Sequence, residues 1–401
     1  MSRAVNASHV LLILAGLLLG AAPADAQNLP VKEMTDQAQT LASDDLGVEV
    51  PLPPAQAAEP APDAKADLVV APIPISNPAF GTGIAGAAVL YYNPNKADQP
   101  WVTGLGGGYT STDSWGAGVF HRMSDTHDRV RFVGFAGYGQ ANLNFYGIGP
   151  NAGSAGVSIK LHDEAFAGLA DAQVRIFDKG FLSHLYVGAR LLYMDLDSTI
   201  KVPLPGRPDL EPPALERNSA IGMIGPSFTF DKRDNATNPR KGVYVTGSLL
   251  YGASWLGSDF GHHKFELGAN AYFPLGRTTV LGIRKQACSV SDDAPYYDLC
   301  LFGQHGDLRG YETGRYRDGA SWAIQAELRQ HLFGKLGGVA FFGVGGIAED
   351  AGAIWKHSTV LTSGGVGIRY LASKDANVNL RADIAWGKDG AAFYFGIGEA
   401  F

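Results

Sequence analysis

Long apolar runs are almost absent from this sequence of 401 residues. Beyond residue 27, no uninterrupted apolar stretch approaches the roughly 20 residues that a membrane-spanning helix requires. An excess of basic residues is also missing, because 32 Lys and Arg stand against 39 Asp and Glu, for a net charge of -7. These two absences exclude a helical membrane protein and a protein with a basic face for nucleic acid.

Motifs for catalysis and cofactor binding are missing as well. There is no nucleophile elbow, catalytic-triad spacing or haem-attachment motif, and His262 and His263 have no further ligands at metal spacing. Gly81–Gly86 spells a dinucleotide fingerprint, but three prolines lie within residues 72–78 before it and residues 87–92 continue as a strand. We therefore predict a strand of small residues there, with no enzyme activity, cofactor or metal site.

The N-terminus has the pattern of an export signal. Arg3 precedes an apolar run from Val10 to Leu19, and an Ala-Asp-Ala triplet ends at Ala26. This predicts a signal peptide over residues 1–26, cleaved before Gln27. Residues 27–67 hold six prolines, eight alanines, eight acids and two lysines without a sustained apolar period, which predicts a disordered lead on the periplasmic side.

Only two cysteines are present, Cys288 and Cys300, twelve positions apart. Because the chain carries an export signal, we expect the two thiols to be oxidised to a disulfide. In the chain-entropy model, a bridge of this span stabilises the folded state by about 3 kcal/mol.

From about residue 68 the sequence becomes a series of short segments in which apolar and polar residues alternate. The alternation is clearest in His263–Phe273, Trp322–Arg329 and Asn377–Trp386, where one face is apolar and the other carries charged side chains. A charged residue at every second position suits a water-filled lumen, and the opposite face suits lipid. An exported β-sandwich or propeller shares the composition, but this alternation favours a transmembrane antiparallel β-barrel over residues 68–401.

The length of the predicted barrel sets its strand number. Its 334 residues (401 - 68 + 1) hold about 16 strands of about 9 to 11 residues with their connections. We expect the strand near Phe80–Tyr92 to pair with a last strand that finishes at Phe401, which removes the free edges. Between Asn142 and Phe177 the pattern allows one strand or three.

The connections between the predicted strands differ in length. Those at Asp178–Phe181, Leu275–Arg277 and Gly334–Gly337 are tight, whereas those at Ser198–Asn218 and Ser289–Gly319 are long and polar. Short periplasmic turns and long external loops produce this difference.

Three segments resemble the bacterial surface antigen family, the BamA-TamA type of outer-membrane assembly superfamily. The first is a strand-turn-strand signature with Asp231, Arg233, Asp234, Pro239 and Gly242. The second is the loop motif Leu308-Arg309-Gly310-Tyr311, and the third is Glu327 in the following strand with the aromatic-glycine segment Phe341–Gly346. The terminal Phe401 resembles the C-terminal insertion signal of outer-membrane barrels. Residues 27–67 are too short for even one polypeptide-transport-associated domain, so the resemblance is to a short member that lacks these domains.

The resemblance implies that the long loop folds into the lumen and is held there by its arginine. Arg309 and Glu327 are the candidates for this pair, and a charge-assisted bond of this kind is worth roughly 1.5 to 3 kcal/mol. The family commonly has a second acid on the next strand, where this sequence has Gly343. That departure leaves open a weaker anchor, or the use of Asp307 or another wall group by Arg309.

Three functions remain open at this level. The first is assistance in the assembly or translocation of proteins, or of lipids, at the outer membrane. The second is a passive channel for small solutes, lined by Lys264, Glu266, Arg329, Arg381 and Asp383, and the third is a surface-exposed structural or adhesion barrel. The expected partners are outer-membrane lipid and the barrel-assembly machinery during insertion of the chain itself.

Overall fold

The computed structural model describes residues 66–95, 101–149, 151–202, 211–214, 216–236, 238–303, 307–373 and 377–401. The predicted signal peptide and all of the predicted lead except residues 66 and 67 lie outside the described residues. Within the described part of the chain, no helix is long and apolar enough to cross a membrane.

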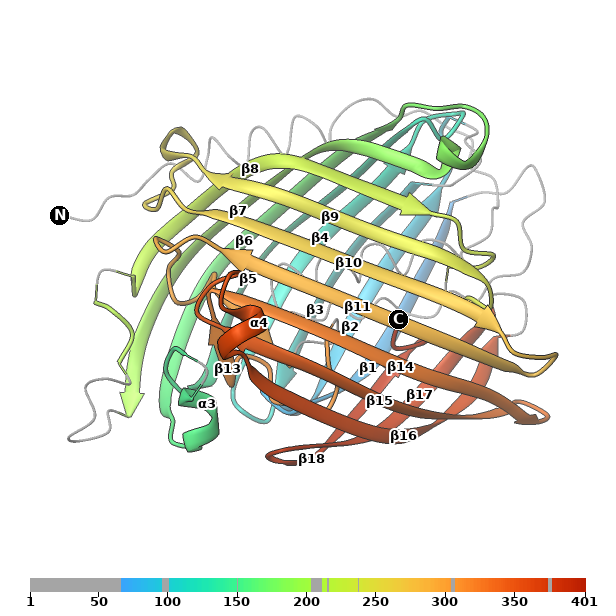
Figure 1. Ribbon diagram of the computed structural model, residues 1–401. Coiled ribbons are helices and arrows are strands. Elements are labelled where there is room, and N and C mark those ends of the chain that lie inside the picture. The colour runs from blue at the N-terminus through green and yellow to red at the C-terminus, as the bar shows by residue number, and fades with distance from the viewer. Residues whose placement is uncertain are drawn as a thin grey trace.

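A single antiparallel sheet of 16 strands dominates the structure (Figure 1). Its strands are β1 (Asp67–Asn77), β2 (Gly81–Tyr92), β3 (Trp101–Thr110), β4 (Trp115–Ser124), β5 (Val130–Phe145), β6 (Ile159–Arg175), β7 (Leu185–Val202), β8 (Asn218–Asp231), β9 (Gly242–Gly252), β10 (His263–Pro274), β11 (Thr279–Val290), β14 (Ala320–Phe333), β15 (Leu336–Ala348), β16 (Thr359–Ser373), β17 (Val378–Gly387) and β18 (Gly390–Ile397). Short helical turns occur in the connections, among them α3 (Ala152–Ala155), η2 (Phe181–His184), η4 (Ser254–Leu256) and α4 (Ile354–His357). The predicted all-β antiparallel fold with about 16 strands is confirmed.

Each strand pairs with the next one along the chain, except where the long loop is inserted. There β11 pairs with β14, and residues 291–319 leave the sheet to form a small hairpin of β12 (Cys300–Phe302) and β13 (Tyr316–Asp318). We call the end of the barrel that carries this loop the loop end, and the opposite end the turn end. Between Asn142 and Phe177 the chain completes β5 and forms a single further strand, β6.

The predicted alternation of faces is visible in β14. Ile324 and Leu328 are 38% and 42% exposed on the outer face, whereas Gln325, Glu327 and Arg329 are almost completely buried on the inner face. The expectation of a water-filled lumen is wrong for this wall, because its charged side chains are covered by other parts of the chain rather than exposed.

The first strand differs from the prediction. It is β1, which contains Pro72 and Pro74, and not the segment at residues 80–92, which forms β2. Proline is tolerated in β1 because this strand ends the ladder series and has a described partner on one side only. Three loop-end connections, at residues 78–80, 111–114 and 388–389, are also short, so short connections are not confined to one end.

The sheet curves so that β1 and β18 come to lie beside each other (Figure 1). The ladders assigned to the described residues run from β1 to β18 and include none between these two strands. We call this junction the seam.

Candidate functional site

The long loop at residues 291–319 lies against the inner wall in two arms. A disulfide between Cys288 of β11 and Cys300 of β12, with Cα atoms 5.7 Å apart, fixes the start of the loop to the sheet. The first arm, at residues 291–299, reaches toward β5, where the rings of Tyr296 and Phe145 are 5.4 Å apart. The second arm, at residues 307–315, turns toward β14–β17.

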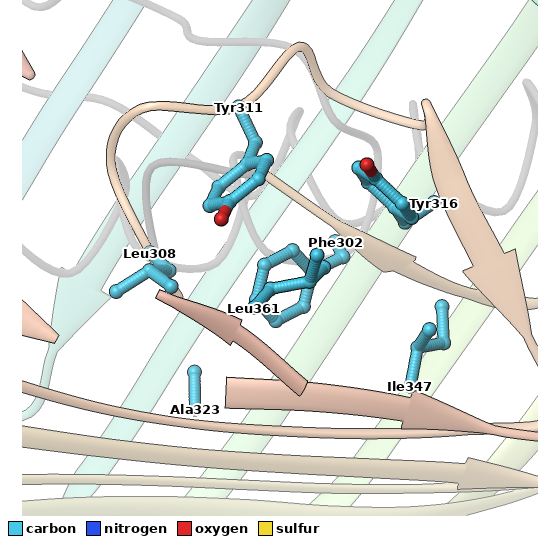
Figure 2. Close-up of a cluster of buried hydrophobic side chains, with 7 residues drawn as sticks. All are labelled: Phe302, Leu308, Tyr311, Tyr316, Ala323, Ile347 and Leu361. Atoms are coloured by element: carbon cyan, nitrogen blue, oxygen red, sulfur yellow. The ribbon is translucent and has the colours of Figure 1, made fainter. Parts of the chain in front are cut away.

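An apolar cluster holds the second arm against the wall (Figure 2). It comprises Phe302, Leu308, Tyr311, Tyr316, Ala323, Ile347 and Leu361. All seven side chains are buried, and the first four come from the loop while the last three come from β14, β15 and β16. The loop is therefore packed in place by apolar contacts as well as by charge.

Arg309 is the centre of the polar contacts of this arm. Its guanidinium donates to Gln325 at 3.0 Å and to Asp383 at 2.7 Å, and it forms an ion pair with Glu327. The guanidinium carbon also lies 3.5 Å from the ring centroid of Phe341. Each of the three guanidinium nitrogens therefore has a partner on the wall. The side chain is only 1% exposed.

Glu327 and Asp383 are shared with two further arginines. Arg329 donates to Glu327 at 2.8 Å, and Arg369 donates to Asp383 at 2.5 Å and lies 3.7 Å from Glu327. Glu399, which follows β18, accepts from Arg369 at 2.7 Å. The resulting set of three arginines and three carboxylates, which we call the wall network, connects the loop with β14, β16, β17 and the end of the chain.

Gly343 stands where the family commonly has its second acid, and the absence of a side chain there has a steric explanation. A Cβ atom on Gly343 would lie 2.2 Å from Leu308 Cδ1, so the loop leucine occupies the space that a side chain on β15 would need. Asp383 on β17 supplies the second carboxylate instead. Asp307 accepts hydrogen bonds from the backbone N–H groups of Gly303 and Leu308.

The other two motif residues of the loop are also held by the wall. Gly310 has φ 113°, which a residue with a side chain rarely adopts, and its N–H donates to the Tyr394 hydroxyl at 2.8 Å. The hydroxyl of Tyr311 donates to the carbonyl of Thr362 at 2.6 Å. Both contacts place the tip of the motif against β16 and β18.

The strand-turn signature forms the connection between β8 and β9 at the turn end. Asp231 accepts two bonds from Arg233, at 3.0 and 2.8 Å, and Asp234 accepts from the N–H groups of Arg240 and Lys241. Pro239 is buried, and Gly242 has φ 120° with its Cβ position 2.1 Å from the Lys232 carbonyl. These residues shape the turn and are remote from the loop motif in the sheet order.

Phe401 does not end the last strand as predicted. β18 ends at Ile397, and Gly398 with φ 84° directs the chain inward. Phe401 then packs on the inner-face residues Tyr272 and Val280, and its carbonyl accepts from Arg329. Because Phe401 is only 7% exposed, it contributes to the interior of the folded barrel, and its part in insertion stays a prediction.

The first arm has a separate polar anchor that the sequence analysis did not identify. Asp298 accepts a bond from Lys264 at 3.0 Å and lies 2.6 Å from His262 Nε2. Burial raises the pKa of the Asp298 carboxyl, but the charge of Lys264 and the bond from His262 outweigh burial, so the pKa is below its ordinary value. Alternation placed Lys264 on the inner face, but no sequence pattern paired it with a loop residue 34 positions later.

We expect the docking of the first arm to depend on pH through Asp298. A depressed folded pKa means that Asp298 stabilises the folded state above its unfolded pKa of about 3.9, and that this contribution is lost as the pH falls through the lower folded pKa. Hydrogen exchange of residues 291–299 should therefore rise below about pH 4 in the native protein. The Asp298→Asn variant should show high exchange at neutral pH and little further change on acidification; a native profile in this variant would contradict the assignment.

The described contacts of the site hold the long loop against the inner wall. Among the described residues, no three His, Cys, Asp or Glu side chains are grouped so as to hold a metal ion. The fold and the site together define a class of protein: a barrel-type antiparallel sheet whose inserted loop is bound to the inner wall through a buried arginine.

Comparison with known families makes this class specific. Residues 215–401, somewhat less than half of the chain, match the Omp85 superfamily domain. This match agrees with the expected resemblance to the BamA type of outer-membrane barrel. A search of curated proteins found no match.

Solved structures share the fold at low sequence identity. BamA from Haemophilus ducreyi lacking POTRA domains 1–3 aligns with a TM-score of 0.55 at 13% identity, over 83% of this chain and 69% of that chain. CdiB from Escherichia coli aligns with a TM-score of 0.57 at 11% identity, over 84% of this chain and 63% of that chain. CdiB from Acinetobacter baumannii aligns with a TM-score of 0.53 at 12% identity, over 83% of this chain and 59% of that chain. The chain thus spans less than two thirds of either CdiB.

Proposed function

We propose that this barrel assists the insertion or translocation of polypeptides at the outer membrane, and that the seam between β1 and β18 is where it acts. The observation that carries the proposal is the missing ladder at this junction among the described residues. An unpaired strand edge presents N–H and C=O groups to which an incoming strand can bond.

Strand length supports the same location. β18 has 8 residues, whereas β6 and β7 have 17 and 18. At about 3.3 Å per residue and a tilt of 35–45°, eight residues span roughly 19 to 22 Å, less than the apolar band of about 25 Å that such barrels usually present. A short wall beside the seam favours local thinning of the bilayer, which lowers the cost of moving a polar strand into it.

The alternative of a passive channel has less support. Of its five proposed lining residues, Glu266 is partly exposed, and Lys264, Arg329, Arg381 and Asp383 are each less than a tenth exposed. The second arm covers the wall beside β14–β17. A channel function therefore requires the loop to leave the wall network.

The test is to measure insertion and conductance in the same liposomes. Refolded native protein should accelerate the folding of an unrelated outer-membrane barrel several-fold over empty liposomes, without steady conductance. Arg315→Ala, which removes a partly exposed ion pair of the same loop with Asp389, is the control and should retain the acceleration. Steady conductance with no acceleration would replace the proposal with a channel.

A further inference from the structure

On one side of the barrel, the exposed charges are mainly basic at the turn end and mainly acidic at the loop end. At the turn end of β8–β15, the three neighbouring connections expose Lys232, Lys241, Arg277 and Lys335, with Asp234 as the one exposed acid among the described residues of these turns. We call the four basic residues the basic rim. At the loop end, the described residues of the connections β9–β10, β11–β14 and β15–β16 expose one lysine and five acids: Lys356, Asp259, Asp292, Asp293, Glu349 and Asp350.

The basic rim is not used for ion pairing within the part of the chain that the structure describes. No described carboxylate forms a salt bridge with any of its four residues. The carboxylate of Asp234 accepts the backbone N–H groups of Arg240 and Lys241 within the turn. Arg240 donates to the carbonyls of Gly276 at 3.2 Å and Arg277 at 3.0 Å, so it joins two of the turns and fixes their relative position.

Exposed apolar side chains lie next to these charges. Leu275, Leu332 and Phe333 are 60%, 56% and 68% exposed, on the same turns or at the ends of the strands that lead into them. The Lys232 ammonium lies 4.9 Å from the ring centroid of Phe181, which is itself 63% exposed. Exposed apolar groups on the same turns as cations that have no described salt-bridge partner form a surface with an apolar part for the membrane and a cationic part for water.

The partner that fits both properties is a lipid with an anionic headgroup. Each turn lies two strand spacings, about 10 Å, from the next turn. The three turns therefore extend over about 20 Å, and the rim faces more than one headgroup. A soluble anion would satisfy the cations but not cover the apolar side chains, whereas a phospholipid does both. The acidic loop end of the same strands repels such headgroups, so the selectivity is confined to one leaflet.

We propose that the basic rim binds acidic phospholipids of the leaflet at the turn end and thereby fixes the depth of the barrel wall opposite the seam. This inference does not rest on insertase or channel activity, since it concerns the membrane position of the barrel alone.

The test is lipid retention by the refolded full chain, followed by native mass spectrometry with equal amounts of phosphatidylglycerol and phosphatidylcholine. The rim variant carries Lys232→Gln, Lys241→Gln, Arg277→Gln and Lys335→Gln. The matched control carries Asp292→Asn, Asp293→Asn, Glu349→Gln and Asp350→Asn, which also removes four exposed charges from the same side. All eight positions are exposed, and circular dichroism with heat-dependent gel mobility verifies folding.

The native chain and the control should retain phosphatidylglycerol in preference to phosphatidylcholine. Each neutralised rim residue should lower phosphatidylglycerol affinity about fivefold, and the single variants Lys241→Gln and Arg277→Gln report this even where the quadruple variant fails to refold. No preference in the native chain, or an equal preference in the rim variant, would overturn the proposal. Displacement by inorganic phosphate but not by chloride of equal ionic strength would identify a site for a free anion and would also overturn it.

Discussion

Replacing Arg309 with alanine should lower the free energy of unfolding by about 3 to 5 kcal/mol, because it breaks a buried ion pair and leaves carboxylates uncompensated. Glu327 and Asp383 are 0% and 3% exposed and cannot be solvated in place of the lost guanidinium. Since Arg329 and Arg369 still contact these acids, we expect the lower end of the range. The second arm should leave the wall while the sheet persists.

Two measurements check this prediction. Denaturant unfolding in micelles gives the change in stability, and limited proteolysis reports whether residues 307–315 have become accessible. Arg315→Ala is the matched control, since this arginine of the same loop is paired with Asp389 at 2.8 Å but is partly exposed. Such a pair contributes up to about 1 kcal/mol. Equal effects of the two variants would show that the wall network does not anchor the loop.

Introducing aspartate at Gly343, where the family commonly has its second acid, should destabilise this protein rather than strengthen the anchor. The added Cβ would lie 2.2 Å from Leu308 and 2.9 Å from the Ile324 carbonyl, and overpacking of this kind costs about 1 to 3 kcal/mol. The new carboxylate would also be buried beside an arginine that already has two acidic partners. We expect Gly343→Asp to lose more stability than Gly343→Ala, which adds only the methyl group.

The double variant with Leu308→Ala and Gly343→Asp separates the two causes. Removing the leucine frees the space beside β15, so part of the lost stability should return if crowding is a main cause. The denaturant midpoints of the four chains give the answer. A Gly343→Asp variant as stable as the native protein would show that Leu308 does not define this position.

Much of the fold could be predicted because the alternation of side chains along a strand is a local property. The inner faces of β10, β14 and β17 follow directly from residue order, since successive residues of a strand point to opposite sides. The strand β1 was missed because its prolines are unfavourable inside a sheet. They are compatible with β1 because it ends the series of ladders, and position in a sheet is not visible in a local pattern.

The site was predicted in part for a similar reason. Arg309 and Glu327 were paired through the resemblance of their motifs, and the two side chains are in contact. Asp383 was assigned to the inner face, but its contact with Arg309 joins residues 74 positions apart. Sequence alternation predicts which face of the sheet a side chain lies on. It does not predict how far along the strand the inserted loop makes its contacts.

The sequence by itself therefore determined the class of fold, the approximate number of strands and the faces of the strands, because these depend on the period of the side chains and on chain length. The tertiary structure alone decided which side chains fill the interior. Register and curvature bring Leu308 onto Gly343, Asp383 to Arg309, and Phe401 onto Tyr272 and Val280. Each of these contacts joins segments that are distant in the sequence, so its energy depends on the curvature of the whole sheet.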